Sequence, residues 1–320
     1  MKRYKLLVLT LYKSFLLLLI YAQTPNIFEN FDFSFSFPFS NTRWNLHDAM
    51  VSSNFIILTR DIKSSEGAIW CTTPVPFRDW EIVIQFQIYG HGENLYGDGM
   101  ALWYVKDKEE KGPVFGSRDN FTGLGIFLDT YNNYNDINDH QHPYISAQVN
   151  DGTRQYNKDK DGTDTQIAGF HTNFRGADKH PIIVISYVRN TLEVKMTYDH
   201  FKTVEKCFEV KGIHLPTGYY FGASAATGEL SDNHVITSFR VFPVIVDRTG
   251  KEAEEDPSKI SPYAEFFSPP RDHVSKPKHI PMTAKKLVLI IILALIGLAV
   301  LFVVGVLVFK KQEESRKRLY

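Results

Sequence analysis

The feature that most constrains this chain is an uninterrupted apolar run near its carboxyl end, Leu287–Phe309. These 23 residues include no charge and no strongly hydrogen-bonding side chain. At a rise of about 1.5 Å per residue, a helix of this length spans a hydrocarbon core of about 30 Å with some tilt. The run therefore predicts a single transmembrane helix over residues 287–309, with a long segment before it and a short tail, residues 310–320, after it.

The amino terminus indicates on which side of the membrane the long segment lies. Residues 1–22 begin with several basic residues, continue as an apolar run and end at the small residue Ala22. This is the pattern of a secretory signal peptide. Lys13 interrupts the apolar run, so an uncleaved N-terminal anchor is the alternative. With a signal peptide, the long segment is lumenal and residues 310–320 are cytoplasmic.

Between the two ends the residue pattern is that of β-strands. Aromatic and polar residues alternate over Phe31–Phe39, and several apolar runs are separated by turns rich in Gly, Asn and Asp. The runs that we expect to be strands are Phe55–Leu58, Trp80–Tyr89, Met100–Tyr104, Leu124–Leu128, Ile145–Val149, Ile182–Val188, Leu192–Tyr198, Tyr219–Ala225 and Val235–Phe242. We expect no long amphipathic helix before residue 280. The pattern predicts one all-β domain, a sandwich or barrel, over residues 23–246.

From Asp247 the composition changes. Residues 247–286 are charged and rich in proline, without hydrophobic periodicity, which predicts a lumenal stalk rather than a second domain. The stalk contains neither heptads nor a cysteine, so we expect a monomer or a weak oligomer. The two cysteines of the chain, Cys71 and Cys207, lie in the β domain. They either pair with each other or remain as small buried residues.

Charge and motifs argue against two classes of function. The 36 basic and 36 acidic residues balance, and no basic stripe is interleaved with aromatic residues, so we expect no nucleic-acid partner. Signatures of hydrolases, such as G-x-S-x-G, H-E-x-x-H and the Glu-x-Asp-x-x-Glu of sandwich-type glycosidases, are absent from the sequence. We therefore do not expect an enzyme. A glycan-processing enzyme would require two carboxylates about 5–10 Å apart across a sugar site.

Oxygen-bearing side chains follow one of the expected strands. Residues 129–133, Asp-Thr-Tyr-Asn-Asn, come directly after Leu124–Leu128, and a second acidic loop contains Asp161. Carboxylate and amide oxygens spaced in this way suit a hard cation such as Ca²⁺. Asp98, between two glycines, and the small-residue segment Gly222–Gly228 would allow a ligand close to the backbone. Plain turns are the alternative explanation of each of these segments.

Long blocks of the sequence, in one order, resemble the animal L-type (leguminous-type) lectins, in particular the vesicular integral-membrane branch. The blocks are SSEGAIW (64–70), GDGMALWYVKD (97–107), GPVFGSRDNFTGLGIFLDTYNN (112–133), PYISAQVNDGT (143–153), KDG (160–162) and LPTGYYFGASAATGELSDNH (215–234). The resemblance implies a concanavalin-like jelly-roll β-sandwich. It also implies a protein that binds high-mannose N-glycans with Ca²⁺ and carries or retains glycoprotein cargo between the ER and the Golgi.

Matching positions assign roles by resemblance. The residues that match the calcium ligands of the family are Asp129, the backbone carbonyl of Tyr131, Asn133 and Asp161. Asp98 and Asn133 match groups that hydrogen-bond mannose, and the loop whose N–H groups face the sugar matches Gly228, Glu229 and Leu230. The peptide bond before Asp98 is expected to be cis.

Some positions depart from the family. A serine of the sugar site is Ala68 here, and a histidine near the last calcium ligand is Lys158. One half of the family's disulfide matches Cys207, whereas the other half falls at Phe170. The calcium set is therefore complete, whereas the sugar set has lost two side chains. A sorting protein that keeps calcium, has lost most glycan affinity and binds cargo through protein contacts is the alternative to a lectin.

Two further sites follow from the topology. Asn120 opens the sequon Asn-Phe-Thr, and glycosylation there and a folded, inaccessible asparagine are both open. The tail ends in Lys317, Arg318, Leu319 and Tyr320, which resembles the basic-then-aromatic ending of the family. We expect vesicle coat components to bind this tail, and the protein to reside in membranes of the ER, the ER–Golgi intermediate compartment and the Golgi.

Overall fold

The computed structural model describes residues 28–39, 43–133, 141–176, 178–250 and 254–265. Contacts divide the chain into two units, residues 1–270 and 271–320, and every described residue belongs to the first unit. The predicted signal peptide, membrane span and tail lie outside the described residues, as does most of the predicted stalk. Within the described ranges, no helix is long and apolar enough to cross a bilayer.

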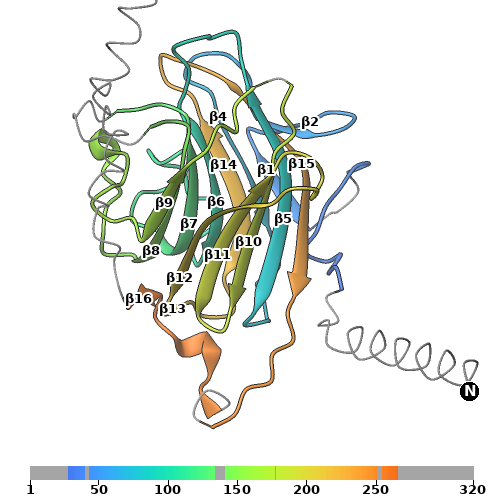
Figure 1. Cartoon of the computed structure of the whole chain (residues 1–320), viewed down its shortest axis with the longest axis vertical. Coiled ribbons are helices and arrows are strands. Elements are labelled where there is room, and N and C mark those ends of the chain that lie inside the picture. The colour runs from blue at the N-terminus through green and yellow to red at the C-terminus, as the bar shows by residue number, and fades with distance from the viewer. Residues whose placement is uncertain (1–27, 40–42, 134–140, 177, 251–253, 266–320) are drawn as a thin grey trace, which may run out of the picture. The chain divides into compact units, whose positions relative to one another are not determined.

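Two seven-stranded antiparallel sheets build the described unit (Figure 1). In the first sheet the order is β1 (Trp44–His47), β4 (Glu66–Cys71), β14 (Tyr220–Ala226), β6 (Gly99–Val105), β7 (Thr122–Asp129), β8 (Tyr144–Asp151) and β9 (Ala168–His171). In the second sheet it is β12 (Glu205–Lys211), β11 (Thr191–Thr197), β10 (Ile182–Val188), β5 (Trp80–Tyr89), β15 (Asn233–Pro243), β3 (Ile56–Thr59) and β2 (Met50–Val51). Strands that are adjacent in a sheet are often distant in sequence.

The main hydrophobic core lies between the two sheets. On β5, every second residue from Trp80 to Ile88 is buried, while the residues between them are only half-buried. This alternation follows from a strand with one face on the core, because successive side chains point to opposite faces. Each fully buried aromatic or branched aliphatic side chain contributes about 1.5–3 kcal/mol of transfer free energy.

A second cluster covers the other face of the first sheet. It combines Trp103 and Phe127 from the strands with Phe115, Phe121 and Tyr156 from loops. Strand β6 is therefore buried along its whole length, because its two faces contact different clusters. The loop that contributes Tyr156 to this cover also carries Lys158 and Asp161 of the candidate site described below.

The structure confirms the predicted β-sandwich. Two of the predicted strands, Trp80–Tyr89 and Ile182–Val188, coincide with β5 and β10. The alternation over Phe31–Phe39, which favours a strand by its period of two, does not form one. This segment forms a turn and one isolated bridge, Phe35 to Phe239, with Phe31 76% exposed. Its alternation reflects packing of Phe33 and Phe35 into the core, and Phe35 forms the bridge to Phe239 on β15.

Some described residues of the predicted stalk contact the sandwich. A short helix η2 (Pro257–Lys259) precedes β16 (Tyr263–Ala264), which pairs with β13 (Ile213–His214). The Tyr263 ring stacks on His214 at 4.3 Å between centroids. Residues of the predicted stalk from Glu255 to Glu265 therefore contact the sandwich. Both Cys71 and Cys207 are buried and free.

Candidate functional site

Strand register brings together the three segments that the sequence singled out, namely Asp98, the loop after β7 and the loop after β14. They lie at the same end of three neighbouring strands of the first sheet. Gly99, the first residue of β6, pairs with Asp129 at the end of β7 and with Ala226 at the end of β14. Asp98, before β6, therefore lies next to the end of β7, where Thr130 donates its N–H to the Asp98 carbonyl, and Gly228, after β14, lies next to Asp98. The sequence therefore positions the site by pairing strands that are about a hundred residues apart.

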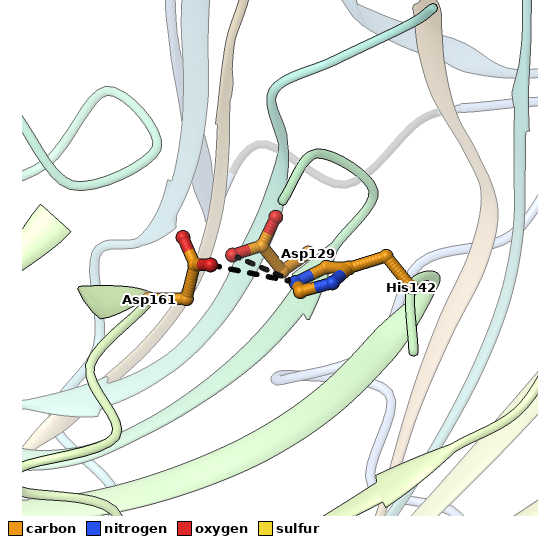
Figure 2. A group of neighbouring side chains, drawn as sticks. All are labelled: Asp129, His142 and Asp161. Carbon is orange, nitrogen blue, oxygen red and sulfur yellow. Dashed lines mark ion pairs between the residues drawn. The ribbon is translucent and has the colours of Figure 1, made fainter. Parts of the chain in front are cut away.

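Two buried acids and a histidine lie together at this end of the sheet (Figure 2). Asp129 and Asp161 are each 4% exposed, and the side chain of His142 is 6% exposed. The Nε2 atom of His142 lies 3.9 Å from Oδ2 of Asp129 and 3.8 Å from Oδ2 of Asp161. Asp161 follows the helical turn η1 (Lys158–Lys160) in a left-handed conformation, φ 49°, which aspartate tolerates better than most residues.

Hydrogen bonds join the loop after β7 to this acid pair. The backbone N–H of Tyr131 donates to Oδ1 of Asp129 at 3.0 Å. The backbone N–H of Asn133 donates to Oδ2 of Asp161 at 3.0 Å, and its side-chain Nδ2 donates to Oδ1 at 2.8 Å. All four residues expected to bind calcium therefore lie in one connected group.

The electrostatics of the group suit a cation. A buried carboxylate costs several kcal/mol unless a counter-charge or a metal compensates it. Ligand atoms of Asp129, His142 and Asp161 lie within 4.8 Å of one another, so one ion could contact all three. Burial, followed by the negative charges of Asp129 and Asp161, raises the pKa of the Tyr156 hydroxyl well above its usual value. Tyr156 therefore stays neutral beside the two acids, and the residues present fit a calcium ion.

A pocket of about 220 Å³ opens beside the acid pair. Its lining includes Asp98, Asp129, Asn133 and Asp161, together with aromatic walls from Phe115 and Tyr156. The Gly97–Asp98 peptide bond is cis, as the resemblance predicts. Asp98 is held by its backbone, since its carbonyl accepts hydrogen bonds from both N and Oγ1 of Thr130 at 3.0 Å. Burial raises the pKa of the Asp98 carboxyl, and the charge of Lys158 opposes this rise.

The loop after β14 lies directly against Asp98. A Cβ atom added at Gly228 would be 3.3 Å from both carboxylate oxygens of Asp98, so the backbone approaches this carboxylate closely. The carbonyl of Gly228 accepts from the N–H of Ser64 at 3.1 Å. Next to it, Glu229 is exposed and pairs with Lys63 at 2.7 Å. A Cβ at Gly97 would be 3.8 Å from Cβ of Leu230.

The two departures from the family occupy different places. Lys158 lines the pocket with Asp98 and is exposed. Ala68, on β4, is 7% exposed and lines a separate cavity of about 10 Å³ with acidic residues and Lys111. In the part of the chain that the structure describes, the lining of the Asp98 pocket does not include Ala68.

His142 is the residue of this site that reasoning from the sequence missed. A histidine in a charged loop is expected to be solvated, but the His142 side chain is buried beside the two acids. The sequence offers one signal, since His142 and Pro143 directly precede the buried strand β8. The neighbouring His140 lies outside the described residues.

Comparisons with known proteins cover most of the chain. A sequence model of the legume-like lectin family matches residues 30–249. Mouse vesicular integral-membrane protein VIP36 is 43% identical over 276 residues, which cover 85% of this chain and 77% of the relative. Human VIP36-like protein is 40% identical over 288 residues, which cover 88% of this chain and 81% of the relative.

A solved structure agrees with these matches. The exoplasmic/lumenal domain of VIP36 in its Ca²⁺/Man3GlcNAc-bound form has a TM-score of 0.72 at 41% sequence identity, covering 74% of this chain and 99% of that chain. From the fold, the arrangement of Asp98, Asp129 and Asp161 and the extent of the matches, this chain belongs to the legume-like lectin family.

Proposed function

We propose that this chain is a Ca²⁺-dependent lectin that binds mannose-type N-glycans and acts as a cargo receptor for glycoproteins between the ER and the Golgi. One observation carries the proposal. Asp98 and Asn133 line one pocket with the buried pair Asp129 and Asp161, and the backbone at Gly228 lies against the Asp98 carboxylate. The VIP36 lumenal domain, with the same fold, has been solved with Ca²⁺ and Man3GlcNAc bound.

Calcium would be held by Asp129, the carbonyl of Tyr131, Asn133 and Asp161. When bound, the ion supplies a fixed positive charge that holds this loop in one conformation. The carboxylates of Asp129 and Asp161 already hold two N–H groups of the loop. His142 places an imidazole beside both carboxylates, which distinguishes this donor set from one made of oxygen alone.

Mannose hydroxyls require hydrogen-bond acceptors and donors in fixed positions. Asp98 supplies a carboxylate whose backbone is fixed by Thr130. The amide of Asn133, held against Asp161, and the N–H groups of Gly228, Glu229 and Leu230 would complete the set. Since the pocket walls include two aromatic rings, an apolar sugar face also finds a surface.

A second candidate is a sorting protein that keeps calcium but recognises cargo through protein contacts. Lys158 favours it, because a flexible cation stands at the pocket where relatives of the family have a histidine. The position of Ala68 outside the pocket lining weakens the second argument for it. The intact group at Asp98 and Gly228 favours the lectin.

Binding of mannose with and without a calcium chelator separates the two candidates. The lectin binds immobilised high-mannose glycans and releases them in chelator, whereas the sorting protein binds calcium without glycan. The variant Asp161→Asn should weaken both calcium and glycan binding at least about tenfold, the range for metal-site partners. Asp164→Asn is the matched control, because Asp164 is on the same loop but exposed and paired with Lys160. Calcium-independent glycan binding would refute the proposal.

We propose a type I orientation, with the tail of residues 310–320 read by vesicle coat components. The name of the relatives, vesicular integral-membrane protein, supports the membrane attachment. Leu319→Ala with Tyr320→Ala should slow exit from the ER, and Lys317→Ala with Arg318→Ala should impair retrieval. Imaging of both variants tests this, and unchanged localisation of both would contradict it.

A further inference from the structure

Two loops of the candidate site come from different sheets. Residues 90–98 follow β5 of the second sheet and end at Asp98. Residues 227–232 follow β14 of the first sheet and include Gly228. Because the loops are more than a hundred residues apart in sequence, their relative position depends on contacts between them.

One arginine contacts both loops. Arg175, between β9 and β10, donates from Nε to Oδ2 of Asp232 at 2.8 Å and from Nη2 to Oδ1 at 2.7 Å. Its Nη2 also donates to the carbonyl of Gly92 at 2.8 Å, and its guanidinium carbon lies 3.7 Å from the centre of the Tyr96 ring. The planar fork of arginine makes these contacts together, which lysine cannot do.

The Arg175 contact is buried and supported. Asp232 is fully buried and the Arg175 side chain is 12% exposed. A second carboxylate, Asp61, bridges the same two loops, accepting from Ser231 Oγ at 2.6 Å and from the N–H of His91 at 2.7 Å. A Cβ at Gly90 would meet Oδ1 of Asp232 at 2.3 Å, so the loop passes this group without room for a side chain.

The separation of the loops sets the distance between the Asp98 carboxylate and the backbone at Gly228. Gly228 stands in close contact with the Asp98 carboxylate, and Leu230 stands beside Gly97. A shift of either loop by a few tenths of an ångström would change the distances among the groups that face the sugar. Arg175 itself does not line the pocket among the residues described.

We propose that Arg175 is a positioning residue for the carbohydrate site: by joining Asp232 to Gly92 and Tyr96, it fixes the two sugar-facing loops relative to each other. This inference rests on the proposed lectin function. In this proposal glycan affinity depends on Arg175, whereas calcium affinity does not, although Arg175 is not among the described residues that line the pocket.

The chain offers a close control for simple loss of stability. Arg248 also binds a buried carboxylate in two-point fashion, Asp79, with the arginine 12% and the aspartate 3% exposed. Asp79 directly precedes β5, whereas the loop of residues 90–98 follows the other end of that ten-residue strand. Breaking either pair leaves a similar buried charge, but only Arg175 contacts the loops of the site.

The experiment compares Arg175→Gln, Arg175→Lys and Arg248→Gln in the full chain, purified in detergent micelles. The double variant Arg175→Gln with Asp232→Asn removes both charges and covers the case in which the single variants fold poorly. Mannose and calcium affinities are measured by calorimetry. Hydrogen exchange of the amides in residues 90–98 and 227–232 is measured without ligand.

We expect each Arg175 variant to lose mannose affinity by about ten- to a hundredfold, as for partners that orient a binding group, with calcium affinity within about threefold. Exchange in both loops should accelerate, and Arg248→Gln should keep wild-type mannose affinity. Equal losses in the Arg175 and Arg248 variants, or wild-type affinity in the Arg175 variants, overturn the inference. If the wild type binds no mannose, the proposed function fails, and the exchange data then decide whether Arg175 fixes the loops. Unchanged exchange in the Arg175 variants overturns the positioning role, and faster exchange of both loops upholds it.

Discussion

His234 should make the domain lose stability as the pH falls. Its side chain, on β15, is fully buried, with Nδ1 2.6 Å from Oγ1 of Thr59. Burial, helped by the positive charge of Arg175, lowers the pKa of the imidazole from 6.5 to about 3. The unfolded chain therefore binds a proton below about pH 6.5 that the folded chain rejects until about pH 3.

The sign and the size of the effect follow from these two pKa values. Because the folded-state pKa is lowered, the stability is fully present above pH 6.5 and is lost as the pH falls toward 3. Between pH 7 and pH 4.5 the linkage relation gives a loss of about 2.5 kcal/mol from this one residue. A folded-state pKa one unit higher changes that figure by only about 0.1 kcal/mol, so the result depends little on its value.

The measurement is urea unfolding of a fragment of residues 23–270, followed by tryptophan fluorescence at several pH values. A comparable lumenal domain of VIP36 has been solved as a separate domain. The variant His234→Asn keeps a polar group near Thr59 but cannot take up the proton. Other groups titrate in both proteins, so the difference between the two pH profiles isolates His234. Equal losses of stability from pH 7 to pH 4.5 in the two proteins would refute the reasoning.

Three further predictions concern the site and its surroundings. Lys158→His exchanges a lysine for an imidazole at the pocket and should strengthen calcium binding at neutral pH about 2- to 10-fold; unchanged calcium affinity by calorimetry would contradict this. Gly228→Ala should weaken mannose binding, because the added Cβ lies 3.3 Å from the Asp98 carboxylate oxygens; unchanged affinity in a glycan-binding assay would contradict this. Asn120, whose side chain accepts from Arg118 at 3.1 Å, should carry a glycan if it is reached in the lumen, so a glycosidase-sensitive shift on gels should vanish in Asn120→Gln.

The sequence predicted buried strands better than edge strands. Strands with the core on at least one face, such as β5 and β10, carry many apolar residues, and this pattern is visible in the sequence whichever strands pair with them. By contrast β12, at the edge of its sheet, has an exposed and charged pattern and was not predicted. The order of strands within a sheet could not be predicted at all, because pairing between β6 and β14 depends on residues more than a hundred positions apart.

The candidate site shows the same division. Asp129 to Asn133 could be found because they follow one apolar strand directly, and their connection to Asp161 matches the resemblance. His142 could not be placed, since its approach to the two acids depends on the fold of a loop rather than on spacing. Arg175 is missed for the same reason: nothing near it in the sequence points to Asp232 or Tyr96.

The placement of β16 determines how a pulling force on the chain near Glu265 would enter the domain. Just before β14, the N–H of Thr217 donates to the carbonyl of Pro257, and β13 and β16 lie at the lower end of the sandwich (Figure 1). The Asp98 pocket is at the opposite end of β14, seven residues or about 20 Å away. Part of any tension between a ligand in the pocket and Glu265 would pass through the pairing of β16 with β13 into β14, and the rest along the chain from the end of β15 at Pro243. Since ladder hydrogen bonds are perpendicular to the strand, those to β4 and β6 would bear this load together rather than one at a time.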